Sequence, residues 1–357
     1  MTEQLEVSKD ESEIVISQGE KVIVIPHAIH IAQYMPGRES PIEPNDFTPE
    51  KVAEYLEDLD SRVNIRTIIG LTVHAFDWNT LFIMEKLVDD LNLNNVQIMY
   101  CVEAYSIRDE SDNNIWSIRQ HLGQHIVLIM PGKPTEMFAL IEGNGLDPVL
   151  YPNDQRFRGM TRFSYIRALK DLGFYSICAH PTERAYPFLD SYLFRELGEL
   201  KRLGVIDAVE LEIDRLVWES RMRRDGWNYI RGVFNNASNL GLKVLVGIDA
   251  HGGWHMLERD ASFQIVFRSN EWEPDLCPLV GFSTLQNTAD IAMSLIELLK
   301  SPNGIVVPQF GIPQVENWKS LSNYFNFKEW AEGGIMGMVL KSVLMAYLDE
   351  VVYRIRH

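Results

Sequence analysis

Residues 66–74, RTIIGLTVH, form an apolar run of strand length that ends in a histidine. Apolar side chains stand at successive positions instead of alternating with polar ones, which is typical of a strand buried on both faces. Six further runs share this richness in Val, Ile and Leu. The sequence therefore predicts seven strands, at residues 21–31, 66–73, 96–104, 125–130, 175–179, 208–213 and 243–248.

Helical patterns separate these strands. Thr48 suits a helix N-cap and Pro49 the first helical position, and apolar residues then recur at helical spacing. Similar stripes predict helices near residues 83–91, 162–172, 191–203, 218–240 and 290–299. Strands that alternate with helices indicate an α/β fold with a parallel sheet. Seven or eight such units suit a closed barrel better than an open sheet, and the loops after the strands of a barrel build its active site.

The predicted barrel spans residues 21–300, with an extension at each end. Residues 1–20 carry six acids and one lysine, which predicts an acidic extension and no signal peptide. Residues 301–357 predict a C-terminal helical extension. Its apolar segment 335–353 contains Lys341, Asp349 and Glu350, too many charges for a membrane span. We expect this helix to be buried in its own chain or in a partner, such as a second copy.

Charge and cysteine content limit the partners and the compartment. Asp and Glu number 50 against 33 Lys and Arg, a net charge of −17. This balance argues against binding to nucleic acid or anionic lipid, which reward basic clusters. A small phosphorylated substrate held through a metal ion is compatible with it. Three cysteines without a C-x-x-C pair predict no disulfide framework, and hence a cytoplasmic protein.

Histidines and acids gather where the predicted strands end. The residues with this placement are His27, His30, His74, Glu103, His180, Asp249 and His251, whereas His125 begins its strand. The C-terminal ends of parallel barrel strands converge on one rim, so these side chains are expected to meet. Imidazole and carboxylate ligands there suit Zn, Mn or Fe. His121, His255 and His357 lack this placement and are interpreted as packed or solvated residues.

Signatures of other chemistries are absent from the sequence. It contains no G-x-S-x-G elbow, no P-loop, no H-E-x-x-H and no G-x-G-x-x-G. Cys101 and Cys178 lie inside predicted strands and are interpreted as small core residues.

The order of these motifs resembles the PHP family, the polymerase and histidinol phosphatase domains. The resemblance runs from about residue 21 to about residue 300. The matching pieces are His27-Ala28-Ile29-His30, Thr72-Val73-His74, Cys101-Val102-Glu103, Gln124-His125-Ile126, Ala179-His180-Pro181 and Ile248-Asp249-Ala250-His251. The resemblance implies a distorted (β/α)7 barrel that holds two or three divalent metal ions and hydrolyses phosphoesters.

The resemblance also implies roles for individual residues. Glu103 would bridge two metals, one completed by His125 and His180 and the other bound by Asp249. The third site would use His74 and His251. Arg184, four residues after His180, would clamp a phosphate or would equally be a solvated surface residue. Glu210 would hydrogen-bond a ligand from behind or form an ion pair.

The sequence departs from the family at the opening motif, which is H-x-x-H where the family has H-x-H. Residues i and i+3 face opposite sides of a regular strand, so His27 and His30 can share a metal only if a bulge redirects the chain. Val73 also replaces the aspartate of the family's T-D-H motif. These changes favour an alternative, a non-catalytic barrel that serves in binding or assembly. A C–N hydrolase on the related amidohydrolase barrel is a third hypothesis.

Overall fold

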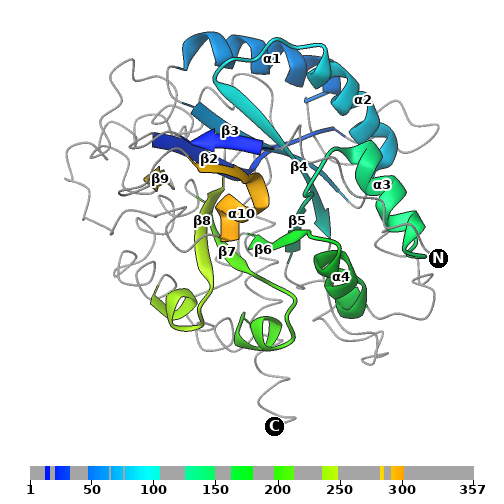
Figure 1. Cartoon of the computed structure of the whole chain (residues 1–357), viewed down its shortest axis with the longest axis vertical. Helices are drawn as coiled ribbons and strands as arrows, with labels where there is room; N and C mark the ends of the chain where they lie inside the picture. The colour runs from blue at the N-terminus through cyan, green and yellow to red at the C-terminus, as the bar shows by residue number, and fades with distance from the viewer. Residues whose placement is uncertain are drawn as a thin grey trace, which may run out of the picture.

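An eight-stranded curled sheet forms the centre of the protein (Figure 1). The computed structural model describes residues 13–16, 21–32, 47–63, 66–74, 77–104, 125–148, 162–179, 197–212, 235–247, 282–284 and 291–300. From one edge to the other, the sheet consists of β8 (Lys243–Gly247), β7 (Ala208–Glu212), β6 (Tyr175–Ala179), β5 (His125–Ile129), β4 (Val96–Ala104), β3 (Arg66–His74), β2 (Lys21–His30) and β9 (Phe282–Thr284). Curling brings β2 and β8 near each other.

The seven strands that the sequence predicts are all present, with ends within one residue of the predicted ones. The expectation of a wholly parallel sheet is wrong at β5, which runs antiparallel to both β4 and β6. This reversal places the start of β5 beside the ends of its two neighbours. His125 therefore lies on the rim where β4 and β6 end, opposite Ala179 in the register.

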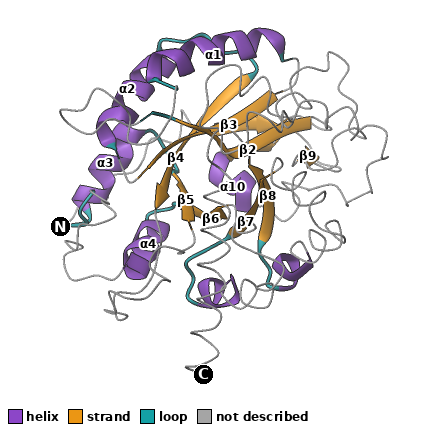
Figure 2. Ribbon diagram, turned by 180° about the vertical axis from the view of Figure 1, so that it is seen from behind, coloured by secondary structure: helices purple, strands orange, loops and turns teal. Residues whose placement is uncertain are grey.

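Helices line the outer side of the sheet (Figure 2). They are α1 (Pro49–Arg62), α2 (Trp78–Asp89), α3 (Pro134–Gly143) and α4 (Arg162–Asp171). The Thr48 side chain accepts a hydrogen bond from the Lys51 backbone N–H at the start of α1, as the sequence predicts for an N-cap. Asp77 caps α2 in the same way through the Thr80 N–H. These helices pack against outward-facing residues of the sheet such as Ile69 and Leu71.

The predicted helix at residues 290–299 is wrong in its first half. Residues 291–294 form strand β10 (Ile291–Ser294), which pairs antiparallel with β1 (Glu13–Ile16) in a separate two-stranded sheet. The helix α10 (Leu295–Lys300) begins only after β10. Pairing with a distant strand therefore overrides local helical spacing here. Strand β1 belongs to the predicted N-terminal extension, so part of that segment is ordered by pairing.

The inner side of the curled sheet changes character from one end to the other. Near the N-terminal ends of the parallel strands it is apolar, lined by residues such as Val24, Ile68 and Met99. Helix α10 packs into this apolar end through Ile296, Leu298 and Leu299. At the opposite end, buried polar side chains replace the apolar ones. An apolar base thus supports a polar rim.

Candidate metal centre

A bulge in β2 builds the first part of the polar rim. Ile25 pairs with Ile69 and Ile29 pairs with Leu71, so three residues of β2 stand opposite Gly70 alone. The two extra residues redirect the chain between Ile25 and Ile29, a stretch that contains His27 and ends next to His30. Both histidines are buried, and their Nε2 atoms lie 2.5 Å apart. The bulge that the sequence requires for His27 and His30 to share a metal is therefore present.

Gly70 leaves room for this bulge. A Cβ at position 70 would lie 1.5 Å from the carbonyl oxygen of Pro26 and 2.4 Å from its carbonyl carbon. The same oxygen accepts a hydrogen bond from the Cys101 thiol on β4, at 3.3 Å. Burial raises the pKa of this thiol well above its usual range, which keeps it protonated as a donor. Cys101 is thus a core residue, as predicted, that also holds the bulge.

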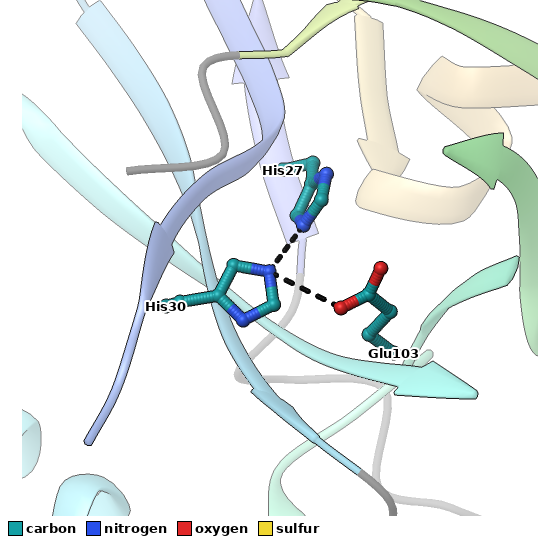
Figure 3. A group of neighbouring side chains, drawn as sticks. All are labelled: His27, His30 and Glu103. Atoms are coloured by element: carbon teal, nitrogen blue, oxygen red, sulfur yellow. Dashed lines mark hydrogen bonds and ion pairs between the residues drawn. The ribbon is translucent and has the colours of Figure 1, made fainter. Parts of the chain in front are cut away.

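Glu103 occupies the centre of the rim, on β4. In Figure 3, His27, His30 and Glu103 point toward one another from two strands. The Glu103 Oε2 atom lies 3.1 Å from Nδ1 of His74 and 3.6 Å from Nε2 of His30. Its other oxygen, Oε1, lies 2.7 Å from Nδ1 of His125. One carboxylate therefore contacts imidazoles from three strands and divides its two oxygens between them.

Strand register explains why these side chains meet. His74 and Glu103 are direct partners in the parallel pair β3–β4, so they share a face. Glu103 pairs with Val127 in the antiparallel pair β4–β5, and His125 is two residues earlier on the same face. Each residue lies at the rim end of its strand, where sequence reasoning expects it.

Glu210 on β7 contacts the cluster from the other side. Its carboxylate oxygens lie 2.9 and 3.1 Å from Nδ1 of His27. The partner of Glu210 is thus His27, itself a candidate metal ligand. This contact joins strands that are not neighbours in the sheet, so no spacing in the sequence could reveal it.

The described residues suit a divalent transition metal. His27, His30 and Glu103 each offer one ligand atom, these atoms lie within 4.8 Å of one another, and all three residues are buried. Neighbouring ligand atoms on a first-row ion are about 3 to 4 Å apart, since each bond is about 2 Å long. A separation of the two imidazoles by about 1 Å would therefore admit an ion. A cation would also compensate the charge of two buried carboxylates.

Several predicted site residues lie outside the described residues: His180, Arg184, Asp249 and His251. The same holds for His121, His255 and His357. His180 follows the last residue of β6, and Asp249 stands two residues after the end of β8. The ligand roles of these residues stay predictions.

Comparison with known proteins adds little to the site geometry. No family model matches the chain, and no curated protein matches it. Among solved structures, the chain is similar to a two-domain protein from Bacteroides vulgatus that contains a predicted PHP-like metal-dependent phosphoesterase. The identity is 11%, the TM-score is 0.33, and the match covers 71% of this chain and 56% of that one, so this chain spans little more than half of its neighbour.

None of the helices in the described part of the chain is long and apolar enough to cross a bilayer.

Proposed function

We propose that the protein is a metal-dependent hydrolase that cleaves a small phosphate ester on a PHP-like, distorted (β/α)7 barrel. The observation that carries this proposal is the buried Glu103 carboxylate, which contacts His30, His74 and His125 from three different strands. A buried carboxylate surrounded by imidazoles is costly unless its charge is compensated, and a divalent cation does this well. The order of sequence motifs points to the same chemistry.

Under this proposal, Glu103 would be shared between two ions. His27, His30 and His125 would hold these ions together with it. The ligands expected to complete the set are His180 and Asp249, with His74 and His251 available for a third ion. Bound Zn, Mn or Fe supplies Lewis acidity, which lowers the pKa of water and stabilises charge on phosphoryl oxygens.

The chain's own residues then have three tasks. The imidazoles and Glu103 hold the ions at fixed positions, and the apolar base of the barrel excludes water from below. Arg184 is proposed to hold a phosphate oxygen. The net charge of −17 disfavours a nucleic acid substrate and leaves a small phosphorylated molecule as the proposed one. Cytoplasmic location and self-association through residues 335–353 belong to the same proposal.

The bulge in β2 bears on the rival, a non-catalytic barrel. Two departures from the family pattern favour that rival: Val73 in place of an aspartate, and an H-x-x-H motif that needs a bulge to present both histidines. In the structure both rings reach the cluster. The proposal therefore favours a working metal centre over a degenerate one.

Metal analysis and a substrate panel test the proposed function. Purified protein should contain at least one equivalent of a transition metal and should hydrolyse phosphomonoesters or phosphodiesters in a metal-dependent way. Protein that binds no Zn, Mn or Fe would support the non-catalytic barrel. Hydrolysis of amides without hydrolysis of phosphoesters would instead support the C–N hydrolase.

A further inference from the structure

The position of the Glu210 carboxylate depends on a glycine in the neighbouring strand. A Cβ on Gly247 of β8 would lie 1.5 Å from Oε1 of Glu210 and 2.4 Å from its Cδ. Any larger residue at 247 would therefore displace the carboxylate. Glu210 itself is buried, and both of its oxygens lie within hydrogen-bonding distance of Nδ1 of His27.

We propose that Glu210 is a positioning residue for His27, and that Gly247 acts on the metal centre through Glu210. A neutral imidazole carries a proton on one of its two nitrogens, and an ionised carboxylate can only accept a hydrogen bond. Glu210 therefore fixes the proton of His27 on Nδ1. The Nε2 lone pair is then directed toward His30 and Glu103, where an ion would need it.

The negative charge of Glu210 also raises the basicity of the His27 ring. The Nε2 lone pair therefore binds a cation more strongly. The carboxylate also sets the angle of the imidazole ring, because its two oxygens lie at nearly equal distances from Nδ1. This inference rests on the proposed function in so far as it assigns His27 to a metal.

A double-mutant cycle tests the proposal through zinc affinity, measured by competition with a chromophoric chelator. We expect Glu210→Ala and Gly247→Ala each to weaken zinc binding by about 10 to 100-fold, the range for residues that orient metal ligands. The double variant should be no weaker than Glu210→Ala alone, because Gly247 has no separate role. Additive losses would overturn the proposed route through Glu210, as would wild-type affinity in Glu210→Ala.

Control variants separate the positioning role of Glu210 from a general loss of stability caused by removing a buried carboxylate. Glu85 is another buried carboxylate, which accepts hydrogen bonds from Thr135. Glu85→Ala should leave zinc affinity within about twofold of wild type, since only local packing changes. Glu210→Gln keeps the volume of the side chain if Glu210→Ala does not fold, and it should still weaken binding through loss of charge.

A measurement on metal-free protein tests the positioning role of Glu210 independently of the proposed metal-dependent hydrolysis. Nitrogen-15 NMR of the histidine rings, with His27 assigned through His27→Gln, reports which nitrogen carries the proton. We expect Nδ1 of His27 to be protonated in wild type and this preference to be lost in Glu210→Ala. An unprotonated Nδ1 in wild type, or no change in the variant, would refute the positioning role. Wild-type protein that binds no zinc but shows the expected NMR result would refute the proposed function alone.

Discussion

Gly70→Ala should damage both the stability of the protein and its metal centre. The added Cβ would lie 1.5 Å from the Pro26 carbonyl oxygen, whereas ordinary van der Waals contact begins at 3.4 Å. The bulge would therefore have to retreat by about 2 Å, and its backbone cannot rotate away as a side chain could. Overpacking of this kind costs about 1–3 kcal/mol or more in the free energy of unfolding. We expect about 3 kcal/mol, since the clash is with backbone.

The displaced bulge carries His27 and His30, so metal binding should suffer more than stability. Metal–ligand distances tolerate only about 0.2 Å, and a shift near 2 Å removes a ligand. Zinc affinity should fall by at least about 100-fold, beyond the range for residues that only orient ligands. A loss of 3 kcal/mol lowers the melting temperature by roughly 4 °C for a chain of this size.

Calorimetry and chelator competition measure these two effects, with Gly143→Ala as the control. Gly143 lies at the end of α3, and a Cβ there meets nothing within 4 Å. Alanine is a better helix former than glycine, so this control should be neutral or slightly stabilising. A Gly70→Ala variant with wild-type melting temperature and zinc affinity would refute the reasoning about the bulge.

Three further predictions concern other parts of the molecule. Glu103→Gln removes the shared charge and should reduce bound metal to below about one tenth of the wild-type content by mass spectrometry, since a carboxylate must be ionised to bind; full metal content would exclude Glu103 as a ligand. Asp249→Asn should abolish hydrolysis of a confirmed phosphoester substrate, and a parental rate would exclude Asp249 from the reaction. Burial lowers the pKa of Lys243 to about 8 in the folded protein, while its Nζ donates to the Leu299 carbonyl oxygen. The unfolded chain then binds more protons between pH 8 and about 10.4, so stability relative to Lys243→Met should rise with pH across that window; a melting-temperature difference that falls or stays constant would contradict the shift.

Much of the sheet is predictable from the sequence because its strands are buried on both faces. Apolar runs such as residues 96–104 and 175–179 have abrupt ends, and the strands β4 and β6 end at the same residues. The direction of a strand cannot be predicted in this way, because an apolar run has the same pattern in a parallel and in an antiparallel strand. The reversal of β5 could be suspected only from His125, the one rim candidate at the start of its strand.

Other features depend on contacts that local patterns do not contain. Helix α3 is not among the predicted helices, although Pro134 stands at its start and Met137 and Ile141 form a short buried stripe. Strand β10 forms because β1, far away in the chain, offers a pairing edge.

The candidate site also combines features that local sequence patterns predict with features that depend on distant contacts. The strand ends that place His74, Glu103 and His125 at the rim are predictable from the sequence, whereas the register that brings them into contact is a property of strand pairing. The H-x-x-H motif needs the bulge, which becomes intelligible only when Gly70 is seen opposite Pro26. The contact between Glu210 and His27 spans 183 residues and two strands that are not paired.

A crystal structure with anomalous scattering, recorded from protein purified with zinc or manganese, tests the central claim most directly. We predict an anomalous peak about 2 Å from a Glu103 carboxylate oxygen, with imidazole nitrogens of His27 or His30 at similar distances. His180 and Asp249 should complete the ligand sets around the same carboxylate. No peak at Glu103, or a His180 ring more than about 10 Å from it, would contradict the proposed metal centre.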